Sequence, residues 1–338
     1  MARYIARRFL WLFLVLFVIS IITFILMRSV PGGPFTREKA LPAATIAILN
    51  QKYNLDATLL EQYASYVGDI FVPRIFSEKI KPSTALDYLM VVKLPFLGKD
   101  TTLRWVNFGP TFKSRTRSVN DIFRENLPVS FKIGLASIVV ALIIGVPLGI
   151  IAALNRNTAV DYVSMGMAIA GVSVPVIVVA PLLQYFIGVP LKLATWQQNG
   201  GVENLFLPAI ALGLGSAALL ARLTRASLLQ VLNEDYIRTA RAKGLSERRV
   251  IALHALKNSM IPVITVLGPL FAALVTGTFV VETVFGIPGM GRYFVTSIQG
   301  RDYPVIMGTI LLYAVFLVLC NLLVDLSYAW LDPRIRFD

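Results

Sequence analysis

The chain has 338 residues, of which 56% are hydrophobic and 15% charged, and its mean hydropathy is +0.70. A soluble fold of this length does not carry so many long uncharged runs, so the composition predicts a membrane protein. A single cysteine and a single histidine exclude a disulfide within the chain, a paired-thiol site and a zinc site of the H-E-x-x-H type. The net charge of +13 would suggest a nucleic-acid partner in a soluble protein, but here it follows the membrane topology.

Six apolar runs are long enough, or nearly so, for the ~20 residues that a helix needs to cross a bilayer core. They predict an all-α polytopic membrane protein with six transmembrane helices, and the even number places both termini on one side. The fourth run is the shortest of them. The runs occupy residues 9–27, 133–154, 163–189, 205–221, 260–281 and 305–324.

The orientation of the helices follows from the Lys and Arg residues in the short connections. Fourteen lie on the side of the N-terminus, and only Lys192, Arg292 and Arg301 lie in short loops on the other side. Because basic residues accumulate on the cytoplasmic side, both termini and the polar segment 233–257 are expected in the cytoplasm. The same excess of basic residues on the cytoplasmic side accounts for the net positive charge, so no nucleic-acid partner is needed to explain it.

The expected organisation has three parts. Residues 1–28 form an N-terminal tail and the first transmembrane helix, which is expected to be retained because no small-residue cleavage site follows it. Residues 29–128 form an extracytoplasmic cap, and residues 129–338 form the core with helices two to six. In the cap, Asp56 is expected to begin an amphipathic helix that continues to Ile70, and residues 83–94 are expected to form another. The cap is therefore predicted to be largely helical.

The polar segment between the fourth and fifth runs has the signals of two short helices. Asn233 is a good N-cap, Arg241 and Lys243 suit the negative end of a helix dipole, and Gly244 supplies a left-handed residue that ends the helix. Ser246 is expected to cap the second helix. This order of residues predicts a compact helical hairpin. The alternative is a solvated loop whose arginines serve only to fix the topology.

Residues 235–246 read D-Y-I-R-T-A-R-A-K-G-L-S and closely resemble the cytoplasmic coupling motif of ATP-binding-cassette importer permeases, in the form of the oligopeptide and dipeptide subfamily. The wider family has E-A-A-x-x-x-G, where this chain has Arg238, Thr239 and Ala240 before Gly244. It also has I-x-L-P ten residues after the glycine, where this chain has H-A-L-K and reaches a proline only at Pro262. The residues that the resemblance assigns to ATPase coupling are Glu234, Asp235, Tyr236, Arg238, Thr239, Ala240, Arg241, Ala242, Lys243, Gly244 and Leu245.

Further motifs extend the resemblance over nearly the whole chain. One departure is Gly33, which replaces the acid of the subfamily's R-x-x-P-G-D-P motif. Residues 72–104 look longer than the corresponding part of the family and have no assigned role. The matching motifs are R-S-V-P-G-G-P at 28–34, N-F-G-P-T-F-K at 107–113, S-V-N-D-I at 118–122, E-T-V-F-G-I-P-G-M-G at 282–291, R-D-Y-P at 301–304 and D-P-R at 332–334.

The resemblance implies the fold of type I importer permeases and the role of a B-type membrane subunit in a peptide importer. It implies a homologous C-type permease, two ATPase subunits and an extracytoplasmic substrate-binding protein as partners, in the cell (inner/plasma) membrane. It also implies that ATP and magnesium bind to the ATPases and that this chain binds no cofactor. An importer of the same class for sugars, nickel or another small solute is the alternative.

The candidate gate or hinge residues are Pro175, Pro262, Pro269 and Glu282. The prolines are candidates because a proline in a transmembrane helix allows a bend, and the helix can then change between two packed arrangements. The alternative is close packing by the small residues beside them. No catalytic residue and no metal site is expected. A secondary carrier would need inverted repeats and charge within the membrane, and an enzyme would need paired carboxylates or a nucleophile with a base. Neither pattern is visible.

Overall fold

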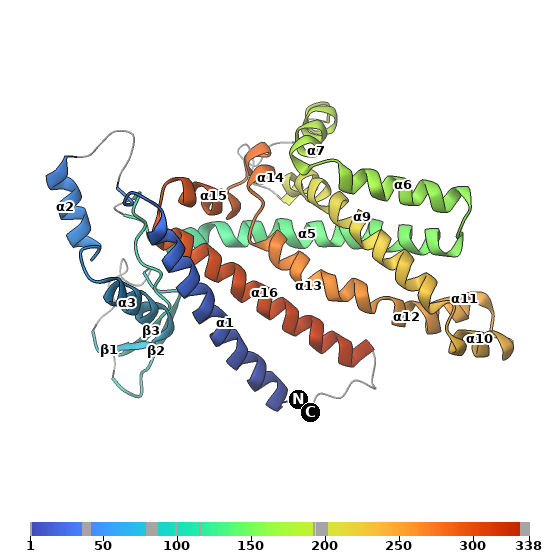
Figure 1. The fold of residues 1–338 in the computed structure, drawn as a ribbon, viewed down its shortest axis with the longest axis horizontal. Coiled ribbons are helices and arrows are strands. Elements are labelled where there is room, and N and C mark those ends of the chain that lie inside the picture. The colour runs from blue at the N-terminus through green and yellow to red at the C-terminus, as the bar shows by residue number, and fades with distance from the viewer. Residues whose placement is uncertain are drawn as a thin grey trace. The chain divides into compact units, whose positions relative to one another are not determined.

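The computed structural model describes residues 2–35, 42–78, 87–98, 100–114, 116–191, 193 and 202–331 (Figure 1). Lys192, the D-P-R motif at 332–334 and the first four residues of the helix expected at 83–94 lie outside the described residues. The chain forms two compact units. Unit 1 contains Met1–Phe13, Val129–Arg292 and Val315–Asp338, and unit 2 contains Leu14–Pro128 and Tyr293–Ala314.

The described part of unit 1 is helical. Arg8 near its N-terminal end forms an ion pair with Asp325 near its C-terminal end, so the first and last helices are joined there. The elements that contribute to unit 1 are α1 (Ala2–Ser29), α5 (Val119–Leu154), α6 (Ala159–Ser173), α7 (Val176–Leu183), the π-helix η1 (Gln184–Gly188), the 3-10 helix η2 (Val202–Leu205), α9 (Phe206–Val231), α10 (Asp235–Ala242), α11 (Glu247–Arg249), the π-helix η3 (Val250–Ala255), α12 (Leu256–Ser259), α13 (Ile261–Val275), α14 (Phe279–Val284), α15 (Gly291–Gln299) and α16 (Tyr303–Leu331).

Four helices of the described chain are long and apolar enough to cross a membrane: Arg7–Ser29, Val119–Leu154, Phe206–Val231 and Tyr303–Tyr328. Two bent helix pairs bring the number to six if each pair is one span. The first joins α6 to α7 and the π-helix after it at 99°, and the second joins 247–259 to α13 at 46°. The six apolar runs of the sequence lie mainly in helices. The third is broken at 174–175, and the fifth begins at the 46° bend and is interrupted between α13 and α14.

Helix α9 lies at the centre of unit 1, where it packs against α6, α7, α12, α13 and α14. It also packs closely against α5, because Gly145 and Gly149 of α5 face the carbonyl groups of Ala217 and Ala221. A Cβ atom at either glycine would lie only 2.5 Å from the facing carbonyl oxygen. At these two positions the small residues thus serve close helix packing, which is the alternative to a hinge.

Gly145→Ala is expected to destabilise unit 1 by about 1–3 kcal/mol, because the added methyl group would push α5 away from α9. Gly166→Ala is the matched control, since nothing lies within 4 Å of a Cβ atom there and alanine favours a helix. Thermal unfolding of the purified protein would measure both variants. Equal midpoints for the two variants would contradict the close packing.

Unit 2 combines helices with a small sheet. Its elements include α2 (Ala43–Lys52), α3 (Leu59–Phe71), β1 (Arg74–Phe76), β2 (Met90–Lys93) and β3 (Thr102–Trp105). The three strands form an antiparallel sheet in the order β1-β3-β2, and Arg104 of β3 lies opposite both Arg74 and Val91. The remaining parts of unit 2 come from α1, the start of α5, most of α15 and the start of α16.

Two expectations for the cap are wrong. The helix expected at 83–94 is contradicted, because residues 90–93 form the strand β2. The β-branched pair Val91 and Val92 pairs with β3, and such pairing outweighs a weak local preference for helix. The helix expected from Asp56 exists, but Thr58 caps it. The Thr58 hydroxyl accepts from the Glu61 amide at 3.3 Å, and the Glu61 carboxylate accepts from the Thr58 amide at 3.1 Å.

Two of the sequence motifs meet within unit 2. Asp302 of R-D-Y-P is buried and accepts hydrogen bonds from the Thr111 hydroxyl at 2.7 Å and from the Phe112 amide at 3.2 Å. Lys113 donates to the carbonyl oxygen of Thr296 at 3.0 Å. The motif N-F-G-P-T-F-K is therefore fixed against the turn between α15 and α16 by a buried carboxylate.

Candidate functional site

The candidate site is the helical hairpin of residues 233–259, which joins α9 to α13 in unit 1 (Figure 1). Helix α10 ends at Ala242, and Gly244 follows it with a φ of 78° in the left-handed region, as the sequence predicts. The amide groups of Gly244 and Leu245 donate to the carbonyl oxygens of Arg241 and Ala240 at 2.9 and 3.4 Å, which closes the helix end. The turn therefore depends on a residue that tolerates a positive φ.

The N-terminal end of α10 differs from the expectation. Glu234, not Asn233, occupies the N-cap position, and it makes no capping hydrogen bond through its side chain. Asn233 instead donates to the carbonyl oxygen of Leu229 at 2.9 Å. Asn233 lies two residues after the end of α9, and its side chain bonds back to that helix rather than forward to the next one. Ser246 occupies the N-cap position of α11, also without a side-chain bond.

The inner face of the hairpin is apolar and buried. Ile237 and Ala240 of α10 pack with Val250, with Leu228 of α9 and with Ala153 at the end of α5. This contact anchors the hairpin to two of the long helices. It also means that Ala240 is covered by the chain's own core, so it does not offer a small surface to a partner.

Two polar contacts hold the hairpin together on its outside. Arg241 binds Glu247 with both ends of its guanidinium, from Nη2 to Oε1 at 2.6 Å and from Nε to Oε2 at 3.1 Å. The hydrogen bonds to Glu247 raise the pKa of Arg241 above its usual value. Asn258 of α12 donates to the Tyr236 hydroxyl at 2.8 Å. The bidentate pair spans the turn at Gly244, so Arg241 serves the hairpin itself.

The outer face of α10 is exposed and polar. Of its basic residues, Arg238 is loosely paired with Asp235 at 3.4 Å, and Lys243 forms no ion pair within the described chain. These two cations are therefore exposed on α10 and its C-terminal end, and the hairpin also exposes Arg248, Arg249 and Lys257. Leu245 is half-buried at the end of the turn. The predicted coupling residues on the exposed face are Glu234, Asp235, Tyr236, Arg238, Thr239, Arg241, Ala242, Lys243 and Gly244.

The candidate gate residues lie at separate places in unit 1. Pro175 is the N-cap of α7 at the 99° bend, Pro262 lies in the first turn of α13 at the 46° bend, and Pro269 lies inside α13. The two bends thus coincide with prolines, as expected for residues that break a helix. The hinge role of these residues stays a prediction.

Glu282 has an environment that the sequence did not reveal. It is 2% exposed and accepts hydrogen bonds from the Ser130 hydroxyl at 2.9 Å and from the Arg292 amide at 3.2 Å. Ser130 in turn accepts from the Met290 amide at 2.8 Å. A Cβ atom on Gly289 would lie 2.2 Å from the Glu282 carboxylate, which explains a glycine there. The carboxylate therefore binds the glycine-rich loop 285–292 to α5.

A second buried acid was missed by the sequence analysis. Asp161 in the first turn of α6 is 2% exposed and accepts two hydrogen bonds from Arg225 of α9, each at 2.6 Å. It also accepts from the Asn157 amide at 3.0 Å. In the sequence, the only indication of this pair is that Asp161 lies just before one apolar run and Arg225 just after another. Only the packing of α6 against α9 brings the two together.

The fold and this site define a polytopic helical membrane protein of the transporter class, with a polar hairpin anchored to its long helices. Residues 145–337 match the family described as the inner membrane component of binding-protein-dependent transport systems, and residues 1–89 match the N-terminal part of such components. The chain belongs to this family of transport permeases, and it is a multi-pass protein of the inner membrane.

Curated relatives and a solved structure agree with this assignment. The chain is 43% identical to the dipeptide transport system permease protein DppB of Bacillus subtilis (strain 168), over 99% of this chain and 98% of that protein. It is 39% identical to the oligopeptide transport system permease protein OppB of Salmonella typhimurium, over the full length of both. A structure of the methionine ABC transporter MetNI in an inward-facing conformation has a TM-score of 0.51 and 16% identity, over 62% of this chain and 96% of that one, which supports the fold.

Proposed function

We propose that this chain is the B-type permease subunit of an ATP-driven peptide importer and forms half of its translocation pathway. Two of its relatives are permeases of dipeptide and oligopeptide transport systems, which favours peptides over sugars or nickel as substrate. The second half of the pathway would come from a homologous C-type permease. An extracytoplasmic binding protein would deliver the peptide, and the chain itself would carry out no catalysis.

The observation that carries the proposal is the anchored hairpin 233–259. Its exposed face presents Arg238 and Lys243, while its buried face packs on the ends of α5 and α9. A partner that holds the exposed face and moves would therefore move two long helices with it. These helices would have two alternative packed arrangements. ATP binding would favour one of them and thereby change the side to which the translocation pathway opens.

The partner on the hairpin would be an ATPase subunit, and two such subunits would bind the ATP and magnesium. Complementary charge favours a groove with acidic residues at its rim, which would accept Arg238 and Lys243. Tyr236 and Ala242 would add apolar contacts on the same face. This arrangement requires the hairpin and both termini to lie in the cytoplasm.

Thiol labelling from each side of the membrane would test this orientation. Lys243→Cys is expected to react with a membrane-impermeant maleimide only in inside-out vesicles, because the hairpin faces the cytoplasm. Leu60→Cys, on an exposed position of α3, is the matched control that should react only in right-side-out vesicles. The native Cys320 is buried and gives little background. Labelling of Lys243→Cys from outside would refute the proposed function.

A further inference from the structure

One face of the sheet in unit 2 is apolar and open. Residues that pair across neighbouring strands direct their side chains to the same face. Ile75 of β1 and Val92 of β2 both pair with Leu103 of β3, and Met90 of β2 pairs with Trp105 of β3. Leu103 and Trp105 are half-buried, but Ile75, Met90 and Val92 are 59%, 49% and 44% exposed. This face therefore presents three large apolar side chains to the surroundings.

The opposite face of the sheet is the packed one. Thr102 and Arg104 of β3 are buried there, and the guanidinium of Arg104 lies 4.2 Å from the centre of the Phe76 ring. The Nε atom of Arg104 also donates to the Thr102 hydroxyl at 3.1 Å. Polar side chains thus lie inside and apolar side chains outside. A sheet with one face in water has the reverse arrangement.

The turn between β2 and β3 adds two more apolar side chains. Phe96 and Leu97 are 78% and 57% exposed. Backbone hydrogen bonds hold the turn in place, from the Leu94 amide to the Thr101 carbonyl oxygen at 2.9 Å and from the Leu97 amide to the Leu94 carbonyl oxygen at 3.0 Å. Such a group of exposed apolar residues marks a contact with a partner or with a membrane. The apolar surface of unit 2 is the group Ile75, Met90, Val92, Phe96 and Leu97.

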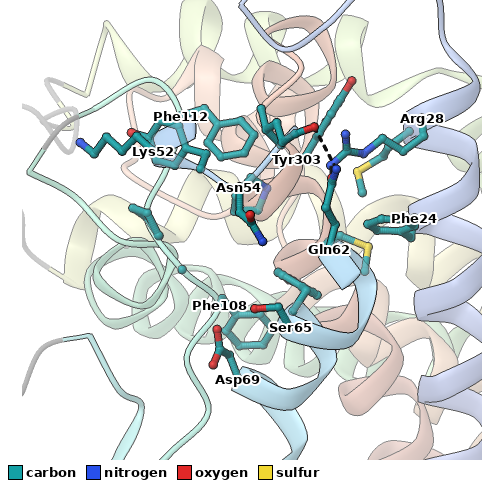
Figure 2. A pocket seen from close by; sticks show the side chains of 18 residues that line it. Phe24, Arg28, Lys52, Asn54, Gln62, Ser65, Asp69, Phe108, Phe112 and Tyr303 are labelled. Atoms are coloured by element: carbon teal, nitrogen blue, oxygen red, sulfur yellow. Dashed lines mark hydrogen bonds between the residues drawn. The ribbon is translucent and has the colours of Figure 1, made fainter. Parts of the chain in front are cut away.

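Helix α3 lies against the last turns of the membrane-spanning helix α1. Figure 2 shows Phe24 and Arg28 of α1 close to Gln62 of α3, and Arg28 donates a hydrogen bond to Gln62. The hydroxyl groups of Tyr63 and Ser20 are hydrogen-bonded at 2.7 Å. Ser20 lies nine residues before the end of α1, inside the apolar run. Helix α3 is therefore at the boundary of the membrane rather than in the water beyond it.

The sheet is fixed to α3. Strand β3 packs against α3, Arg74 of β1 binds Oδ1 of Asp69 at 2.6 Å, and the Asn107 amide donates to the Asp69 carbonyl oxygen at 3.0 Å. In Figure 1 the strands lie level with the C-terminal half of α1, whereas α2 lies beyond that end. The same half of α1 exposes Ile22 and Ile25, which face lipid in a membrane-spanning helix. The apolar surface of unit 2 is thus level with a surface that already contacts lipid.

We propose that the apolar surface of unit 2 inserts into the bilayer and anchors the sheet there. Strand β2 is an edge strand, and open sheet edges do not occur within the hydrocarbon region. Its backbone would therefore stay among the lipid headgroups, while the apolar side chains reach the boundary of the acyl chains. Residues 72–104 include six basic and three acidic residues, which complements anionic lipid. This gives a role to a segment that the coupling function does not use, and it holds for any transported solute.

Spin labels on single introduced cysteines would test the contact, in the full-length chain in nanodiscs of phosphatidylcholine and phosphatidylglycerol. At Phe96→Cys and Val92→Cys, collisions with dissolved oxygen are expected to rise and collisions with an aqueous nickel complex to fall, both relative to Ile48→Cys. Ile48 is the matched control, because it is apolar and 66% exposed but belongs to α2, beyond the end of α1. Ile22→Cys gives the signal of a site in lipid. The native Cys320 is buried, and the chain without an introduced cysteine measures its background.

Three outcomes would overturn the inference. The first is that the labels at Phe96→Cys and Val92→Cys collide with both reagents as often as the label at Ile48→Cys, which would place them in water. The second is low collision rates with both reagents, which would mean contact with protein. The third is a nickel rate that falls only after the binding protein is added, which would indicate a docking site for that protein. Peptide uptake by the assembled importer tests the proposed function separately, because the lipid contact does not depend on the solute.

Discussion

Gly244→Asp is expected to lower peptide uptake by the assembled importer about tenfold or more, while the subunit remains in the membrane. Gly244 is exposed at the turn of the hairpin, and its φ of 78° disfavours side chains with a Cβ atom, asparagine and aspartate less than others. The new carboxylate would also lie next to Lys243 and would face the acidic rim that we propose for the ATPase groove. Uptake of a labelled dipeptide into proteoliposomes and the ATPase rate of the same samples would measure the effect.

Gly244→Asn separates the two causes of this loss. Asparagine has the shape of aspartate and tolerates a positive φ, but it carries no charge. It is expected to retain most of the uptake if charge is the main cause. There is open space around a Cβ atom at this position, so neither variant should clash within the chain. A Gly244→Asp complex with the normal number of ATPase subunits and unchanged uptake would contradict the coupling role of the hairpin.

The sequence was sufficient for the features that depend on local signals. The long apolar runs predicted the helices, and the glycine after a basic helix end predicted the left-handed turn at Gly244. The coupling motif pointed to the hairpin itself. Each of these features needs only neighbouring residues in the chain, because backbone conformation and helix ends are set over a few positions.

The features that were missed depend on partners far apart in the sequence. Ala240 reads as a small exposed residue until Val250 and Leu228 are seen to cover it. Residues 90–93 read as part of a helix until β3 provides a paired strand. Glu282 reads as a charge at a helix end until Ser130 is found beside it, 152 positions earlier. No periodicity or spacing in one sequence specifies such contacts.

Arg225→Met is expected to destabilise unit 1 strongly. It would leave Asp161, which is 2% exposed, with one backbone hydrogen bond from Asn157 and only the more distant charge of Arg156. Removing one partner of a buried ion pair costs about 3–5 kcal/mol, and the lower end applies here because Arg225 is 27% exposed. Thermal unfolding, followed by tryptophan fluorescence, would measure the loss.

The double variant Asp161→Asn with Arg225→Met identifies the reason for that loss. If an unpaired buried charge causes it, removing the charge should restore most of the unfolding temperature, because the remaining amide can still accept from Asn157. If the double variant is as unstable as Arg225→Met alone, lost packing of the arginine stem is responsible instead. The distinction bears on transport as well. Arg225 lies in the last two turns of α9, which leads into the hairpin, so the ion pair adds a charged contact to the packing of α6 on α9 through which a movement of the hairpin would reach α6.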